Sequence, residues 1–391
     1  MYFLTINAGS SSIKFCLFDT TTLAEDYTGS IAGIGFDTAT FSVTDSSGQK
    51  ERHELTLTNH ASAGQLLQEW LEQRIARESI AAIGHRIVHG GPLYSKSVVI
   101  TDDVMAKLSS IIPLDPEHLP NQVALVDQLR HELPDVPQIA CFDTAFFYNL
   151  PTVAQLLPIP RKYTAEGIRR YGFHGLSYSY LLQEFERVAG SEAAHGKVIF
   201  AHLGNGASLA ALQGGEPIDT SMGLTPAGGI PMSTRSGDLD PGLLTYLATE
   251  KNMSAEELGH MTGFESGLLG ISETSSDMKK LLGSESDDSR AKEAVDIFCY
   301  QTRKFIGAYA AALGGLDSLV FSGGIGEVSA AIRGRICNGL DFLGISLDDD
   351  RNKANSERIS VDGARVGVHV LATNEALSIA RDMQQIVTKN N

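Results

Sequence analysis

The length and composition of the chain indicate a globular protein of two domains. It has 391 residues, of which 42% are apolar and 20% charged, so each domain could bury a core of its own. The formal net charge of −16 argues against general binding to nucleic acid or to an anionic membrane, since both need a basic surface. No apolar stretch reaches the length of a membrane span, and the N-terminus lacks the pattern of a signal peptide.

The cysteines point to a reducing compartment. Cys16, Cys141, Cys299 and Cys337 are far apart and form no CxxC pair, which argues against a zinc site or a disulfide framework. Cys16 and Cys299 lie in apolar runs, so we expect them to be buried. We therefore expect a cytoplasmic protein.

Two similar strand–turn–strand patterns open the two halves of the chain. Residues 2–7 and 13–18 are typical of buried strands, and they flank a turn of small residues at 8–12. Residues 197–201 and 209–212 flank a second such turn at 202–208. The recurrence indicates an internal duplication, with the boundary near residue 146.

Other elements follow in chain order. A helix is predicted over residues 65–75, with Leu66, Leu67, Trp70 and Leu71 on one face, and a strand over 138–142. A long helix is predicted over 291–313, ended by Gly314 and Gly315. A buried strand at 318–321 then leads into a glycine segment at 322–327, and a strand at 366–371 precedes a final helix at 375–387.

Three small-residue loops are candidates for phosphate binding. They span residues 8–12, 204–208 and 322–327, and each follows an apolar strand. Glycine lets a backbone approach a phosphate closely, so that exposed N–H groups can bind it. The Gly-Lys pair at residues 196–197 is followed by Val198, so the Walker A pattern is missing. Each loop alone is more often a plain turn, but three in one chain favour a nucleotide site.

Two arginines stand among small residues rather than among the charges of a surface helix. Arg86 follows a strand, and Arg235 lies in a serine- and glycine-rich loop. Phosphoryl transfer needs fixed positive charge around the moving group, which arginine supplies, although a structural arginine bonded to loop carbonyls fits the local pattern equally well.

Acids and histidines complete the set of candidates. Asp143 ends a predicted strand and suits Mg²⁺, whereas Glu375 starts a helix, where an acid is favoured in any case. His174 lies between glycines and could stabilise a transferring phosphoryl group, or be an ordinary loop residue. His118 lies in a proline-rich loop and is a weaker candidate.

Taken in order and spacing, these segments resemble the acetate kinase family over almost the full length of the chain. The motifs are INAGSSSIKF (6–15), GHRIVHGG (84–91), FDTAF (142–146), IRRYGFHG (168–175), HLGNGASL (202–209), DTSMGLTP (219–226), TRSGDLDPG (234–242), FSGGIGE (321–327) and TNEALSIARD (373–382).

The resemblance implies a duplicated actin-like α/β fold with a ribonuclease H-like core, of the superfamily of sugar kinases, heat-shock ATPases and actin. Its two domains would be 1–146 with about 376–391, and 147–375 with the nucleotide site. It also implies a homodimer that uses ATP or ADP with Mg²⁺, or Mn²⁺ in its place, and an active site between the domains.

Site residues follow from the same resemblance. The catalytic set is Asn7, Arg86, His118, Asp143, His174 and Arg235, with Asn7 and Glu375 at the metal. The pocket for the acyl group is Val88, Leu114, Phe173 and Pro226. The ATP-binding set is Ser10, Ser12, Lys14, His202, Gly204, Asn205, Gly206, Asp277, Lys279, Gly323, Gly324, Ile325 and Gly326.

The sequence departs from the family pattern in several places. Phe147 stands where the family usually has a histidine, and Leu176 and Tyr178 change the segment after His174. Segment 113–121, PLDPEHLPN, differs from the usual PLHNPPN, and His118 is the candidate for its histidine. Lys279 and Val328 change the base site and leave the nucleotide preference open.

The predicted reaction is reversible in-line phosphoryl transfer from ATP to acetate, giving acetyl phosphate and ADP. Propionate is an alternative acceptor, because one methylene is worth only about 1–3 kcal/mol in a pocket. A nucleotide-dependent switch or ATPase on the same fold is an alternative of another class, but it would have no need of Arg86, His174 and Arg235 together. A sugar kinase is a third, and Val88 and Pro226 are too apolar for a polyol.

Overall fold

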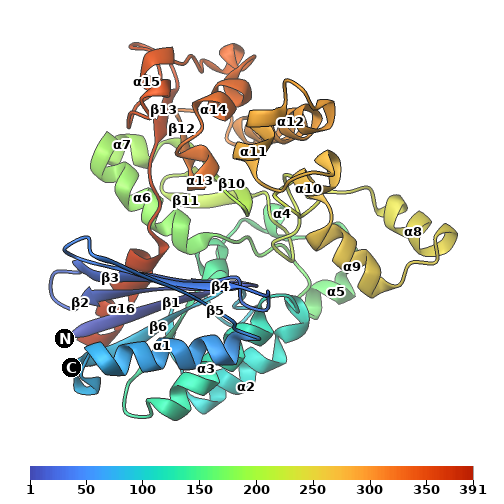
Figure 1. Cartoon of the computed structure of the whole chain (residues 1–391). Helices are drawn as coiled ribbons and strands as arrows, with labels where there is room; N and C mark the ends of the chain where they lie inside the picture. Colours follow the sequence, from blue (N-terminus) through green and yellow to red (C-terminus); the bar gives the residue numbers. More distant parts are fainter. Residues whose placement is uncertain (391) are drawn as a thin grey trace. The chain divides into compact units, whose positions relative to one another are not determined.

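The computed structural model describes residues 1–390 and divides into two compact units, which are described here one by one (Figure 1). The first unit comprises Met1–Tyr148, Gly175–Tyr180 and the C-terminal segment from Asn374. The second comprises Asn149–His174 and Leu181–Thr373. Within the described residues no helix is long and apolar enough to cross a membrane.

The first unit is built on an eight-stranded sheet. The strands lie in the order β5-β4-β3-β2-β1-β6-β8-β7. Their bounds are β1 Tyr2–Ala8, β2 Ser12–Asp19, β3 Glu25–Ala32, β4 Ala39–Asp45, β5 Lys50–Leu55, β6 Ile80–Ile87, β7 Val98–Val99 and β8 Gln138–Phe142. Its helices are α1 His60–Arg74, α2 Asp102–Ser110, α3 Leu119–Glu132 and α16 Glu375–Asn390.

Alternate residues of a strand point to opposite faces of the sheet, and in β1 both sets include buried residues. Helices therefore cover both faces. Leu4 and Ile6 of β1 belong to a core with α1 and α3, where Trp70 and Leu129 are buried. Phe3 of β1 belongs to a second core, on the side of α16. The C-terminal helix therefore packs on the strands that begin the chain.

The second unit holds a five-stranded sheet in the order β11-β10-β9-β12-β13. Its strands are β9 Lys197–Leu203, β10 Ala207–Gln213, β11 Glu216–Thr220, β12 Ser318–Ser322 and β13 Gly367–Val370. Its helices are α4 Thr152–Gln155, α5 Arg161–Ala165, α7 Ser191–Ala194, α8 Pro241–Glu250, α9 Ala255–Phe264, α10 Gly267–Ser272, α11 Met278–Ser284, α12 Ser289–Ala312, α13 Gly323–Gly326, α14 Ala330–Cys337 and α15 Asp349–Lys353. Helix α6, Gly175–Ala189, begins in the first unit and ends in the second.

The two sheets repeat one topology, which confirms the predicted duplication. In the first unit β2 is antiparallel to both β1 and β3, whereas β6 is parallel to β1 and β8 is parallel to β6. In the second unit β10 is antiparallel to both β9 and β11, whereas β12 is parallel to β9 and β13 is parallel to β12. Each predicted strand–turn–strand pattern is thus the central hairpin of its sheet.

Most predicted elements lie where the sequence placed them. The predicted helix at 65–75 is the second half of α1, and the one at 291–313 is α12, which ends at Ala312 before Gly314 takes a positive φ of 64°. All four cysteines are free and buried, as expected for Cys16 and Cys299.

The unit boundaries differ from the expected ones at one segment. Gly175–Tyr180 belongs to the first unit, although the sequence assigned it to the second. The physical reason is packing. Leu176 is buried in the core beside α16, and the rings of Tyr178 and Phe147 pack with their centroids 5.7 Å apart. The first unit otherwise extends to Tyr148, and it resumes at Asn374.

Candidate active site

Four predicted site residues of the first unit meet at one edge of its sheet. Strands β1, β6 and β8 are parallel, so their carboxyl ends lie at the same edge. Asn7 stands near the end of β1, Arg86 near the end of β6, and Asp143 directly after β8. Glu375 is the first residue of α16 and joins them from another part of the chain. Ligands of open α/β sheets bind at such edges.

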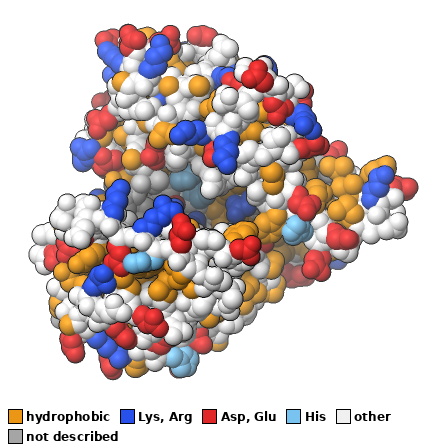
Figure 2. Space-filling view, in the orientation of Figure 1, with side chains coloured by type: hydrophobic (Ala, Val, Ile, Leu, Met, Phe, Trp, Pro, Cys, Tyr) orange, Lys and Arg blue, Asp and Glu red, His pale blue; other side chains and the backbone are white. Residues whose placement is uncertain are grey.

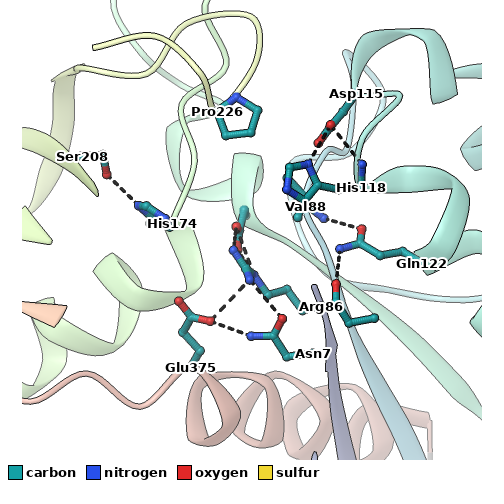
Figure 3. A network of polar contacts seen from close by, with 12 residues as sticks. Asn7, Arg86, Val88, Asp115, His118, Gln122, His174, Ser208, Pro226 and Glu375 are labelled. Atoms are coloured by element: carbon teal, nitrogen blue, oxygen red, sulfur yellow. Dashed lines mark hydrogen bonds and ion pairs between the residues drawn. The ribbon is translucent and has the colours of Figure 1, made fainter. Parts of the chain in front are cut away.

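Hydrogen bonds join these four side chains into one network (Figure 3). The Nε of Arg86 donates to both oxygens of Asp143, at 3.1 and 3.2 Å, and its Nη2 donates to Oδ2 at 2.6 Å. Its Nη1 donates to Oδ1 of Asn7 at 3.0 Å. The amide of Asn7 in turn donates to Oε2 of Glu375 at 3.0 Å, and that oxygen lies 3.8 Å from Nε of Arg86.

The charges of this network keep the arginine protonated. Burial alone would lower the pKa of Arg86, but the facing carboxylates of Asp143 and Glu375 outweigh it, so the pKa lies above its usual value. The Asp143 side chain is 0% exposed, whereas those of Arg86 and Glu375 are 16% and 18% exposed. Asp143 thus fixes the guanidinium from the buried side, and the partly accessible members of the network are Asn7, Arg86 and Glu375.

A second polar group lies beside this network. Val88, which follows β6, is buried, and its N–H donates to Oε1 of Gln122 at 3.0 Å. The amide of Gln122 donates to the carbonyl of Ala8 at 3.0 Å, so α3 is anchored to the ends of β1 and β6. His118 precedes the first turn of α3, and its Nδ1 lies 2.9 Å from Oδ1 of Asp115 (Figure 3).

The remaining first-unit candidates are Leu114, before α3, and three residues of the β1–β2 hairpin, Ser10, Ser12 and Lys14. Leu114 is half-buried and packs against the core that contains Ile87. Ser10 lies on the turn between β1 and β2, and Ser12 begins β2; the hydrogen bond from Gly9 N to Ser12 O closes this turn at 2.8 Å. Lys14 is exposed on β2, in register with Asn7.

In the second unit, His174 is held by its backbone and by its ring. It lies at the start of α6 with a φ of 60°, in the left-handed region. Its Nδ1 lies 2.9 Å from the hydroxyl of Ser208 on β10, and its ring stacks on that of His202 with centroids 4.4 Å apart. Both contacts come from the hairpin of β9 and β10, so His174 has a fixed place beside the small-residue turn.

That turn also receives Arg235. A Cβ added to Gly206 would lie 3.0 Å from Nε2 of His174 and 3.7 Å from Nη1 of Arg235, so these two candidates flank one glycine. The same Nη1 donates to the carbonyl of Pro226 at 3.3 Å. Asn205 accepts a hydrogen bond from the N–H of Ser233, two residues before Arg235, at 3.2 Å. Candidates from three motifs therefore meet at the end of β9.

The predicted glycine segment lies next to the same turn. It forms α13 directly after β12, which is parallel to β9. Gly323 has a φ of 77°, and a Cβ there would lie 2.7 Å from the carbonyl of Leu203, so only glycine fits. A Cβ on Gly204 would lie 3.7 Å from the N–H of Gly324. The edge thus carries two adjacent small-residue loops, which can approach a phosphate chain closely.

Comparison with known proteins shows the family of this chain. The family model described as "Acetokinase family" matches residues 2–381. An acetate kinase of Rhodopseudomonas palustris is 44% identical over 391 residues, which cover 98% of each chain. An acetate kinase of Clostridium botulinum is 40% identical over the whole of both chains. The chain belongs to the acetokinase family.

Solved structures of this family have the same fold. The crystal structure of an acetate kinase from Porphyromonas gingivalis is 36% identical, with a TM-score of 0.89 over 99% of both chains. A propionate kinase from Francisella tularensis is also 36% identical, with a TM-score of 0.92 over 97% of this chain and 98% of that one. The expected family and the expected fold class are both confirmed.

Some of the predicted site residues lie away from the two small-residue loops. Asp277 caps α11 by accepting a hydrogen bond from the N–H of Lys279 at 2.8 Å, and both residues are exposed. Their role at the adenosine stays a prediction. Phe173 is 1% exposed in the second unit, whereas Val88 lies in the first, so the acyl pocket also stays a prediction.

The resemblance predicts Mg²⁺, and the donors at the first-unit edge fit such an ion. Mg²⁺ usually takes one or two carboxylates, and the remaining ligands are water and substrate phosphates. Glu375 is accessible and borders the network, whereas both oxygens of Asp143 are occupied by Arg86. Among residues 1–390 no group of three or more His, Cys, Asp and Glu side chains is arranged to hold a metal.

Two residues that position this site were missed by sequence reasoning. Glu327 accepts hydrogen bonds from the N–H groups of Gly323 and Thr373 at 2.8 and 3.2 Å, so it ties the glycine segment to the strand end before Glu375. Its place at the end of the FSGGIGE motif was the available signal. Gln122 gave no such signal, because an amide in a helix is ordinary until its partners are known.

Proposed function

We propose that this protein transfers the γ-phosphoryl group of ATP reversibly to acetate, giving acetyl phosphate and ADP. Membership of the acetokinase family and acetate kinase relatives at 40–44% identity support the reaction. The observation that carries it in this chain is the set of fixed arginine and histidine side chains. Arg86 is locked by Asp143 and Asn7, and Arg235 and His174 flank Gly206. A nucleotide switch would need the glycine loops but not these three side chains together.

The proposed chemistry is direct in-line transfer. A carboxylate is already a nucleophile at neutral pH, so no general base is needed. The protein's task is therefore to hold the acceptor in line and to stabilise negative charge on the moving group. We assign the charge stabilisation to Arg86 from the first unit and to Arg235 and His174 from the second. The proposal requires that all three act on the same phosphoryl group.

The nucleotide is assigned to the edge of the second sheet. Asn205, Gly206 and the segment Gly323–Gly326 would bind its phosphates through backbone N–H groups, with His202 beside them. Ser10, Ser12 and Lys14 of the first unit are proposed to reach the same phosphates from the β1–β2 turn. Asp277, Lys279 and Ile325 are proposed around the adenosine.

The proposed metal site uses Asn7 and Glu375. Bound with the nucleotide, Mg²⁺ would neutralise charge on the phosphate oxygens. Glu375 has the accessible carboxylate, and Asn7 holds it in place through a hydrogen bond at 3.0 Å. Mn²⁺ has similar ligand preferences and is proposed as a substitute.

We propose that the enzyme is a homodimer that works in the cytoplasm. Helix α8 has no buried residue, and Leu243 and Tyr246 on it are 41% and 53% exposed. Figure 2 shows hydrophobic side chains gathered at the end of the molecule that α8 forms. A second copy would cover such a surface. The four free, buried cysteines suit a reducing compartment. Sedimentation analysis should give twice the mass of the chain, and Tyr246→Glu should shift it towards the monomer.

One assay tests the reaction and its acceptor. Hydroxylamine traps acyl phosphates, so the purified protein is incubated with ATP, Mg²⁺ and acetate, propionate or butyrate in turn. The proposal expects a trapped product with acetate and a lower kcat/KM as the acid lengthens. A higher value with propionate would make the chain a propionate kinase, a name that one solved relative carries. ATP hydrolysis without any trapped product would refute the kinase and favour the switch.

A further inference from the structure

A buried histidine holds the turn between β1 and β2. His60 is the first residue of α1, and it is 8% exposed. Its Nε2 lies 2.7 Å from the carbonyl oxygen of Gly9, a residue 51 positions earlier in the chain. A carbonyl oxygen only accepts hydrogen bonds, so Nε2 carries a proton and donates it. The neutral ring suffices for this contact, which therefore needs no charge on His60.

Helix α1 gives this donor a fixed place. Asn59 caps the helix, because its side chain accepts the N–H of Ser62 at 3.0 Å. Further along α1, Leu67 and Trp70 are buried in the core that also contains residues of β1 (Figure 1). The helix is thus held both at its start and along its buried face, so the ring of His60 stays beside the turn.

Other elements hold the neighbouring carbonyls of the same turn. The carbonyl of Ala8 accepts a hydrogen bond from the amide of Gln122 at 3.0 Å. The carbonyl of Ser11 accepts the N–H of Ile34, on the connection between β3 and β4, at 3.0 Å. With Gly9 included, three successive donors, from α3, α1 and this connection, fix the direction of carbonyls in the turn.

Fixing a carbonyl also fixes the N–H on the other side of its peptide group. The carbonyl of Gly9 and the N–H of Ser10 belong to one planar trans peptide, so they point in opposite directions. Because the carbonyl points to buried His60, the N–H of Ser10 points away from α1. Ser10 is exposed, and its N–H donates to no group among residues 1–390. An oriented backbone N–H of this kind suits an anion.

We propose that His60 is a positioning residue for the nucleotide. By binding the carbonyl of Gly9, it directs the N–H of Ser10 to an oxygen of the phosphate chain. His60 itself touches no substrate and transfers no proton. A donor that is oriented before the ligand arrives lowers the cost of ordering the loop on binding. This inference rests on the proposed function, in which the β1–β2 turn reaches the phosphates of ATP.

Substitutions of His60 test the role of its donor. His60→Leu keeps an apolar side chain in the site but removes the N–H. We expect KM for ATP to rise about tenfold, because one charge-assisted hydrogen bond to phosphate loses its direction. KM for acetate should change less than about twofold and kcat less than about threefold, since the contact is made equally in the ground state and the transition state. His60→Gln, whose amide donates from nearly the place of Nε2, should restore KM for ATP.

Substitutions of Ser10 test whether His60 acts through this residue. Ser10→Pro removes the backbone N–H, whereas Ser10→Ala removes only the hydroxyl. Ser10→Pro should raise KM for ATP, and His60→Leu should then add little to it. In the Ser10→Ala background, His60→Leu should have its full effect, because the N–H that it orients is still present.

A matched control is available in the same unit. His53 lies on β5, its side chain is 61% exposed, and its Nε2 lies 2.9 Å from a carboxylate oxygen of Glu51. His53→Leu should leave both KM values unchanged. Urea unfolding followed by Trp70 fluorescence checks that each variant is folded. If His60→Leu does not fold, His60→Ala replaces it in the same assays, because alanine removes the donor without adding bulk.

Different results overturn the two proposals. An unchanged KM for ATP in a folded His60→Leu or His60→Ala would refute the role of His60. So would an equal rise in KM for acetate, a failure of His60→Gln to restore KM for ATP, or an effect that persists undiminished in the Ser10→Pro background. Absence of acyl phosphate from the wild-type protein would instead refute the proposed function, and with it the basis of this inference.

Discussion

Replacing Arg86 by alanine should destabilise the first unit far more than a surface substitution does. Asp143 is 0% exposed, and three N–H···O contacts from Arg86 occupy both of its oxygens. Removing one partner of a buried ion pair costs about 3–5 kcal/mol, because the other charge is left uncompensated. Arg86→Ala should therefore lower the free energy of unfolding by that amount, and Arg86→Ala with Asp143→Ala should recover part of it.

Urea unfolding followed by tryptophan fluorescence measures this effect in the correct unit. The chain has one tryptophan, Trp70, which lies buried on α1 in the core of the first unit. Arg77→Ala is the control, because Arg77 and Asp135 form an exposed pair at 3.8 Å that is worth about 0–1 kcal/mol. If Arg86→Ala were as stable as Arg77→Ala, the conclusion that Arg86 compensates the buried carboxylate would be wrong.

Four further predictions concern Arg235, Gly206, Glu327 and His85. Arg235→Ala should lower kcat by about 10²–10⁴ in steady-state assays, with a smaller effect on nucleotide affinity, because it removes charge needed most in the transition state. Gly206→Ala should lower kcat at least about tenfold, because its Cβ would lie 3.0 Å from Nε2 of His174; Gly307→Ala, with open space around it, is the control. Glu327→Ala should raise KM for ATP and leave KM for acetate unchanged, since the glycine segment loses its hydrogen bonds. Burial lowers the pKa of His85 to about 4, below its unfolded value near 6.5, so the folded protein should lose stability as the pH falls through that range. His85→Gln should flatten this pH dependence of the free energy of unfolding, measured by Trp70 fluorescence.

The sequence predicted the strands and loops that carry the site, because their local patterns are strong. Residues 139–142 are uniformly apolar, and with Gln138 they form a strand buried along its whole length. The strands β3 to β5, over residues 25–55, were not predicted. Strand β3 begins with two acidic residues, and β5 is polar at five consecutive positions and exposed along most of its length, so neither shows the alternation of a half-buried strand. Strand β4 does alternate, but it is short and lies between these two polar strands.

Side-chain partners could not be predicted from the sequence for a different reason. Arg86 and Asp143 are 57 positions apart, and Asn7 and Glu375 are 368 apart, so no local pattern joins them. What joins them is the parallel order of β1, β6 and β8, which is a property of the whole sheet. Local context left a structural and a catalytic Arg86 equally weighted, and the geometry shows that it is fixed on one side by Asp143.

The duplicated topology explains why one construction gives two different half-sites. The turns after β1 and β9 occupy equivalent places in their sheets, and each is followed by an antiparallel return strand. The difference lies in the neighbouring parallel strand. Arg86 is the penultimate residue of β6 and buried Val88 follows that strand, whereas β12 is followed by a glycine segment whose backbone packs against the carbonyl of Leu203. A side-chain cation at one edge suits a small anion, and bare backbone at the other suits a chain of phosphates. On the proposed assignment, the same fold supplies an acceptor half and a nucleotide half, because different residues follow equivalent strands.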